Sequence, residues 1–221
     1  WDLVLVSVLG HQVAPLLAAL DKSAAKRIMF MFNTFEPLGP LRDAVGSQRF
    51  AFGFPAILAR VDEHGRLESS IKRHGLQTTV TDRALAEVFS AAGIPAVVSP
   101  QMESWLRSHA AAVVPVMLAS SVAHERRAGI TWHEAVALAG VMEESFALVR
   151  QLGFEVLPAA HSVIAGLPAK AKAALLWSAT RNEAVRASGA AGRVEARHLI
   201  ASMLAAAPSG MPQLERAALT L

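Results

Sequence analysis

Residues 2–8 read Asp2-Leu-Val-Leu-Val-Ser-Val8, and this stretch, with the residues that follow it up to position 33, decides the fold. The run is apolar and rich in β-branched residues, which is typical of a buried strand. Between positions 11 and 20 the apolar side chains recur at helical spacing, which predicts an amphipathic helix. A second apolar run at 27–32 predicts another strand, which ends at Asn33. Strand, helix and strand form a βαβ unit, so we expect two parallel strands in one sheet.

This unit places three polar residues at one edge of the expected sheet. Ligands of open α/β sheets bind beyond the carboxyl ends of the strands. Asn33 follows the second strand, and His11 and Gln12 follow the first. All three are therefore candidates for binding a small molecule. The alternative for Asn33 is a structural one, because asparagine also suits an ordinary turn.

The rest of the first hundred residues reads as a mixture of short elements. Asp82 can cap one of the helices and Gly93 can end it. Gly53-Phe54-Pro55 predicts a turn where the chain leaves the sheet. The expected elements are a helix over 37–45, strands over 49–54, 67–72, 76–80 and 94–98, extended chain over 56–60, a turn over 62–65 and a helix over 83–92, with the strands over 67–80 antiparallel.

Beyond Pro100 the pattern becomes helical throughout. Thr131 and Glu134 fit a capping box at the start of one helix. The expected helices cover 102–124, 131–152, 170–187 and 195–206, with a short flexible loop over 189–192. The predicted fold class is α/β plus all-α: a partial Rossmann-like parallel sheet over 1–99, followed by an all-helical C-terminal domain over 100–221.

The composition excludes several classes of protein. Hydrophobic residues make up 53% of the 221 and charged residues 18%, which is enough apolar material for a sizeable core. There is no cysteine, so disulfides and thiolate metal sites are excluded, and a cytoplasmic location is expected. The net charge is +3, but the basic residues are scattered, so we expect no nucleic-acid partner. The apolar stretch over 110–123 is short and contains Pro115, so we expect a core helix and no membrane span. No metal site is expected, because no H-E-x-x-H motif occurs.

Several strings, in their order along the chain, carry a resemblance to a known family. They are the apolar strand over 2–8 with Gln12 after it, the strand ending at Asn33, Gly53-Phe-Pro55, Ala92-Gly-Ile-Pro95, Met102-Glu-Ser-Trp-Leu-Arg-Ser-His-Ala-Ala111 and Leu152-Gly-Phe-Glu-Val-Leu-Pro158. Together they resemble the ketopantoate reductase family, also called 2-dehydropantoate 2-reductase. The resemblance implies an NADP-dependent oxidoreductase of pantothenate biosynthesis that reduces the ketone of a 2-oxo acid. It also implies a dinucleotide-binding domain over 1–99, a substrate and dimerisation domain over 100–221, and a possible homodimer.

One part of the family pattern is not found in this sequence. The family begins with a strand and a Gly-rich phosphate loop, and nothing in this chain reads G-x-G-x-x-G. The chain also starts at Trp1, without a methionine, and runs directly into a strand. We therefore expect this sequence to be the C-terminal portion of a longer protein.

The resemblance also assigns roles to individual residues, with three departures. Asn33 corresponds to a residue near both cofactor and substrate, and Ser209 or Gly210 corresponds to a serine that contacts substrate. His11 and Gln12 are expected to contact cofactor because of their position after the first strand. Arg107 stands where the family carries its catalytic lysine, while Leu9 and Ala111 replace a lysine and an asparagine. A guanidinium is a poor general acid but can clamp a carboxylate or polarise a carbonyl. His109, two residues on, could then supply the proton.

Two main hypotheses for the function follow, and a third is a further possibility. The first is the NADP-dependent reductase, with Arg107 in place of lysine. The second is a non-catalytic relative that binds a nucleotide or metabolite and self-associates through its helices, which the changes at Leu9, Arg107 and Ala111 favour. The third is a helical dimerisation module, whose Ala-rich stretch over 110–123 would suit close packing between subunits.

Overall fold

The computed structural model describes residues 1–61, 64–71 and 77–219. Contacts within the chain divide it into two compact units. The sheet unit consists of residues 1–33 and 37–103, and the helical unit consists of residues 34–36 and 104–221. The three residues 34–36, which follow the second strand, thus group with helices that are far away in sequence.

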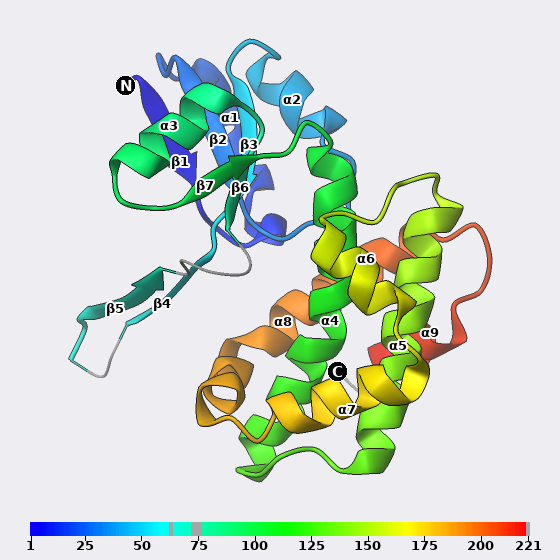
Figure 1. Cartoon of the computed structure of the whole chain (residues 1–221). Helices are drawn as coiled ribbons and strands as arrows, with labels where there is room; N and C mark the ends of the chain where they lie inside the picture. The colour runs from blue at the N-terminus through cyan, green and yellow to red at the C-terminus, as the bar shows by residue number, and fades with distance from the viewer. Residues whose placement is uncertain (62–63, 72–76, 220–221) are drawn as a thin grey trace. The chain divides into compact units, whose positions relative to one another are not determined.

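The sheet unit is built on a five-stranded sheet of mixed direction (Figure 1). Its strands are β1 (Leu3–Val6), β2 (Arg27–Met31), β3 (Phe50–Phe54), β6 (Thr78–Val80) and β7 (Ala96–Val98), in the order β1-β2-β3-β6-β7. The strands β1, β2 and β3 are parallel, which confirms the βαβ prediction. β6 runs antiparallel to β3, and β7 runs parallel to β6. The register pairs Leu3 with Arg27 and Ile28 with Phe50.

The second strand is the centre of this unit. Ile28, Met29 and Phe30 of β2 are completely buried. Phe30 stacks on Phe52 of the neighbouring strand, with ring centroids 6.4 Å apart. A strand covered on both faces needs apolar side chains at every position, which explains why residues 27–32 do not alternate.

The connection between β1 and β2 differs from the single helix expected over 11–20. It consists of two 3₁₀ turns, Gly10–Gln12 and Ala14–Leu16, followed by the short helix α1 (Leu17–Lys22). Pro15 explains the difference, since a proline disfavours the α conformation in the residue before it. The helical spacing was present, but the regular helix starts only after the proline.

The remaining elements of the sheet unit lie close to their expected positions, but their pairing differs: the strand over 67–71 pairs with a strand over 57–61, and the strand over 78–80 pairs within the main sheet. Helix α2 covers Gly39–Val45 and α3 covers Arg83–Ala91. The Asp82 side chain caps α3 by accepting a hydrogen bond from the Leu85 amide at 3.0 Å. Strands β4 (Ile57–Val61) and β5 (Leu67–Ile71) form a separate antiparallel ribbon (Figure 1). Parts of the expected turn over 62–65 and of the strands over 67–72 and 76–80 lie outside the described residues.

The helical unit packs around one long helix. Its elements are α4 (Met102–Arg126), α5 (Trp132–Gln151), α6 (Ala159–Gly166), α7 (Ala169–Ala179), α8 (Glu183–Ala206) and α9 (Pro212–Leu219). Ala110, Ala111, Ala119 and Ala123 of α4 are at most 1% exposed. The Ala-rich stretch is therefore already covered by this chain's own helices, which removes the basis for the third hypothesis.

Helix α4 is also, among the described residues, the one long and apolar enough to span a membrane by length and composition. However, 72% of its most apolar window is buried inside the structure. This burial is what a core helix of a helical bundle shows, and it agrees with the expectation from the sequence.

The start of α5 is as expected, but the end of the chain differs from the expectation. Glu134 and Thr131 form the capping box, with the Thr131 amide donating to the Glu134 carboxylate at 2.7 Å. The expected helix over 170–187 is instead interrupted after Ala179, and Asn182 caps α8. The expected loop over 189–192 is wrong, because both of its glycines lie inside α8. Helices α6 and α9 were not expected.

Candidate functional site

The carboxyl ends of the three parallel strands bring the first group of candidate residues together. Since β1 and β2 are parallel, the turn Gly10–Gln12 and residue Asn33 follow strand ends at the same edge of the sheet. The contact is close: a Cβ added to Gly10 would lie 3.1 Å from the Asn33 carbonyl oxygen. The structure thus places His11, Gln12 and Asn33 on neighbouring segments, as the strand order requires.

The side chains at this edge differ in how freely they can meet a ligand. His11 and Gln12 are exposed, and Asn33 is half-buried. The Gln12 side-chain oxygen accepts a hydrogen bond from the Leu9 amide at 3.0 Å, so it also shapes its own turn. The edge is therefore polar, with an imidazole at His11 and side-chain amides at Gln12 and Asn33.

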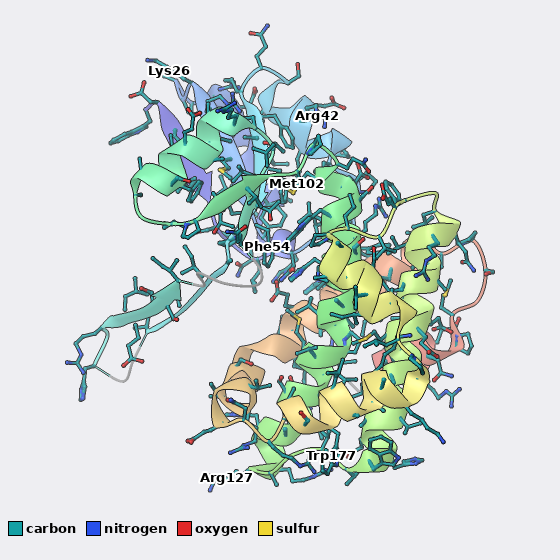
Figure 2. All side chains as sticks on the ribbon, in the orientation of Figure 1. Lys26, Arg42, Phe54, Met102, Arg127 and Trp177 are labelled. Atoms are coloured by element: carbon teal, nitrogen blue, oxygen red, sulfur yellow. The ribbon has the colours of Figure 1, made fainter. Side chains whose placement is uncertain are left out.

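The third parallel strand ends at the same edge. Phe54, labelled in Figure 2, is the last residue of β3, after which the chain leaves for β4. Gly53 is paired with Met31 and Val80 inside the sheet rather than in a turn. A Cβ at Gly53 would approach the Thr79 carbonyl oxygen to 2.9 Å, so close packing between strands explains this glycine.

In the helical unit, Arg107 is a buried cation between two phenyl rings. It lies on α4 and is only 4% exposed. Its guanidinium carbon lies 4.9 Å from the ring centre of Phe35 and 4.5 Å from that of Phe154. Aromatic faces attract a guanidinium, and its planar fork of N–H donors matches the geometry of a carboxylate. Such a group can hold a carboxylate or polarise a carbonyl oxygen.

His109 occupies a different environment from Arg107, although it lies on the same helix. Two residues correspond to about 200° around an α-helix, so the two side chains leave α4 in nearly opposite directions. The His109 imidazole stacks on the indole of Trp105 at a centroid distance of 5.0 Å. Burial, and then the proximity of His161, lower the pKa of His109 to about 3. The imidazole is uncharged at neutral pH in this environment, and its expected role as the proton donor stays a prediction.

His161 completes this buried cluster and was not singled out from the sequence. Its ring lies 5.5 Å from that of His109, and its Nδ1 is 2.8 Å from the Leu157 carbonyl oxygen. The pKa of His161 is lowered by burial, while the hydrogen bond to Leu157 acts in the opposite direction. No local pattern links positions so far apart in sequence, which is why the pair could not be found without the structure. Across the described residues, no three His, Asp or Glu side chains gather as a metal site would require.

Ser209 lies away from regular structure. It is exposed in the segment between α8 and α9. Unlike Arg107, it is therefore not held in a buried environment by packing. Its expected contact with substrate stays a prediction.

Comparison with known proteins identifies the architecture. Neither a family model nor a curated protein sequence matches this chain. Solved structures do match over its whole length. The 2-dehydropantoate 2-reductase from Methylococcus capsulatus matches with a TM-score of 0.70 and 13% identity, over 99% of this chain and 73% of that one. The chain has the ketopantoate reductase fold.

Two further solved structures have the same fold. A dimeric ketopantoate reductase from Staphylococcus aureus matches with a TM-score of 0.65 and 11% identity, over all of this chain and 76% of that one. D-mandelate dehydrogenase, solved with NADH and anilino(oxo)acetate, matches with a TM-score of 0.70 and 11% identity, over 99% of this chain and 74% of that one. This chain therefore spans about three quarters of the length of each of these structures.

The sheet edge fits part of a nicotinamide cofactor. A flat ligand that crosses the carboxyl ends of β1 and β2 needs a close backbone approach and polar groups beside it. Gly10 does not supply the first, because the Asn33 carbonyl oxygen already occupies the space at its Cβ position. His11, Gln12 and Asn33 supply the second. The pyrophosphate is not accounted for, since the sequence contains no G-x-G-x-x-G.

Proposed function

We propose that this protein is an NAD(P)-dependent oxidoreductase of the ketopantoate reductase type, which reduces the ketone of a 2-oxo acid. The observation that carries the proposal is the buried Arg107 on α4 of a chain with the ketopantoate reductase fold. An oxo acid carries both groups that a guanidinium recognises, a carboxylate and a carbonyl oxygen. NADP as the particular cofactor, ketopantoate as the particular substrate, a homodimer and a cytoplasmic location belong to this proposal.

The chain's own residues would have two tasks, binding the cofactor and binding the substrate. When bound, the cofactor would supply the hydride that the carbonyl carbon accepts, and the resulting alkoxide oxygen would take its proton from water. His11, Gln12 and Asn33 would hold the cofactor at the sheet edge. Arg107 would hold the substrate and stabilise the negative charge that develops on the carbonyl oxygen. The ring contacts from Phe35 and Phe154 fix the guanidinium plane, so little side-chain freedom is lost when a substrate binds.

Arg107 is the residue on which the proposal is tested first. In the full-length protein we expect Arg107→Ala to lower kcat/KM for 2-oxo acids by a factor of 100 or more, roughly the loss of an electrostatic donor in other enzymes. Arg107→Lys keeps the charge and adds an ammonium that can donate a proton, so it should retain far more activity. NADPH and NADH oxidation, followed at 340 nm with a panel of 2-oxo acids, measures both.

Arg150→Ala is the matched control for this experiment. Arg150 is an exposed residue at the end of α5. Its loss should leave turnover unchanged. Equal activity of Arg107→Ala and Arg150→Ala would remove Arg107 from the reaction.

Asn33 tests the other half of the proposal. We expect Asn33→Ala to weaken binding of NADPH, because it removes an amide from the sheet edge, while Asn33→Asp should weaken it through repulsion of the phosphates. Calorimetric titration measures both affinities without any turnover. Unchanged affinity in both variants would mean that the cofactor does not bind at this edge.

The second candidate function is that of a non-catalytic relative. It is favoured by Leu9 and Ala111, apolar residues where the family carries polar ones, and Ala111 is fully buried in the core. Nucleotide binding without oxidation of NADPH or NADH by any 2-oxo acid would decide for this candidate. Light scattering on the same preparation would measure whether the protein self-associates.

A further inference from the structure

A cavity of about 350 Å³ lies within the helical unit, among α4, α5, α8 and α9. Pockets that hold small molecules begin at about 300 Å³. The cavity touches α4 around Leu118, which is 11 residues from Arg107, or about 16 Å along the helix axis. It is therefore a different place from the site proposed for the oxo acid.

The walls of the cavity are mainly apolar. They come from three helices: Leu118 and Val122 of α4, Ala137, Leu138 and Val141 of α5, and Ala217 of α9. Water in such a space makes few hydrogen bonds, so a ligand with a hydrocarbon portion would be favoured there.

The charged residues of the cavity are not equivalent. Arg193 pairs with Glu125, at 2.8 Å between Nη2 and Oε1. Glu134 is bound by two nitrogens of Arg126, at 2.8 and 2.5 Å. Both charges are thus already balanced.

Arg216 is the exception. Its contact within the described part of the chain is a long hydrogen bond from Nε to the Pro212 carbonyl oxygen, at 3.4 Å. No carboxylate among the described residues lies within ion-pair distance of it. An apolar cavity with one unbalanced cation at its wall is complementary to a molecule with a hydrocarbon chain and a single negative group.

We propose that this cavity binds an amphipathic carboxylate, with its hydrocarbon chain between α4 and α5 and its carboxylate at Arg216. The ligand class is that of medium-chain aliphatic acids. Decanoate, kept below its micelle concentration, is the probe, and calorimetric titration of the full-length protein is the measurement. Octanoate, which is shorter by two methylenes, should bind about tenfold more weakly.

Two variants separate the two halves of the site. Arg216→Gln removes the charge and should weaken decanoate binding about tenfold, equivalent to about 1.4 kcal/mol. Ala137→Trp fills the cavity from an exposed position, so it should fold normally and abolish binding. Their matched controls are Arg150→Gln and Val136→Trp, which change exposed residues of α5 outside the cavity. Both controls should bind like the unmodified protein.

Three results would overturn the proposal. They are no saturable binding of decanoate, equal binding by Ala137→Trp and Val136→Trp, and equal affinity for decanoate and for uncharged decanol. A second copy of the chain could also occupy the cavity. In that case Ala137→Trp would convert a dimer into a monomer in sedimentation while decanoate failed to bind, and the proposal would equally fail. None of these readouts depends on NADPH or on turnover, so this proposal and the reductase proposal can fail separately.

Discussion

His109 links the stability of the helical unit to pH. Its imidazole is buried against Trp105 and its pKa is lowered to about 3, whereas an unfolded histidine has a pKa near 6.5. Between these two values the unfolded chain binds a proton that the folded chain does not. Stability is therefore complete above about pH 6.5 and is lost progressively as the pH falls toward 3.

Replacing His109 with phenylalanine should remove most of this pH dependence. On going from pH 7 to pH 5, protonation of His109 in the unfolded chain lowers the unfolding free energy of the unmodified protein by about 2 kcal/mol. The variant should not show this loss. The ring of phenylalanine can still stack on Trp105. Urea unfolding at both pH values measures the difference, and the exposed His133→Phe serves as control. If the His109 variant lost as much stability between pH 7 and pH 5 as the unmodified protein, the burial argument would be wrong.

Sequence reasoning found the residues of the sheet edge but not the histidine pair. The common location of His11, Gln12 and Asn33 could be predicted, because parallel strands bring their carboxyl ends to one edge of the sheet. This holds independently of how the rest of the chain folds. The environment of His109 could not be predicted, because it depends on His161, which lies on another helix. Arg107 was found through a resemblance, and its contact with Phe35 comes from packing that no local pattern encodes.

At the level of elements, the crossing of α4 and α8 depends on one glycine. A Cβ at Gly189 would lie 2.1 Å from the Ser120 carbonyl oxygen, which is backbone and cannot move aside. The Ser121 hydroxyl donates a hydrogen bond to the Gly189 carbonyl oxygen at 3.1 Å across the same contact. The two helices must separate to accept any side chain at this position.

Gly189→Ala should therefore destabilise the protein, although alanine favours helices. We expect a loss of about 1–3 kcal/mol of unfolding free energy, the usual cost of overpacking. Gly166→Ala is the matched control, since no atom lies within 4 Å of its Cβ position at the end of α6. That variant should be neutral or slightly stabilised. Thermal denaturation of both proteins checks the prediction, and equal melting temperatures would contradict it.

The same glycine explains the largest error of the sequence prediction. Gly189 and Gly192 have low helix propensity, so they indicated a loop, whereas helix packing at Ser120 required a residue without a side chain. The start of α8 did carry a signal, because Asn182 caps it by accepting a hydrogen bond from the Ala184 amide at 2.9 Å. Pro212, the first residue of α9, is a similar signal. The central strand β2 was easier to predict, because its apolar run is short and rich in aromatic residues.

At the scale of the whole molecule, the segment 34–36 belongs to the helical unit although it follows β2 directly. Phe35 is 1% exposed in the helical core and contacts the Arg107 guanidinium. A boundary placed near residue 100, as the sequence suggests, omits this contribution. The helical unit is thus completed by a residue from the first part of the chain.

Phe35→Ala should destabilise the helical unit by about 3–5 kcal/mol. Tryptophan fluorescence reports on this unit, because Trp105, Trp132 and Trp177 lie in it and Trp1 is 90% exposed. Phe52→Ala, an equally buried phenylalanine of the sheet unit, is the comparison variant. It should shift the fluorescence transition less than Phe35→Ala does. A larger shift for the Phe52 variant would show that Phe35 is dispensable for the helices.

Asn33 and Phe35 are separated by one residue, so along an extended chain their α-carbons are at most about 7 Å apart. Asn33 belongs to the proposed cofactor edge, and Phe35 contacts the Arg107 guanidinium. If the two proposed ligands influence each other, that influence must be reciprocal: an anion held at Arg107 would change affinity at the sheet edge by the same factor as the converse. Titrating one ligand at several fixed concentrations of the other would measure this factor.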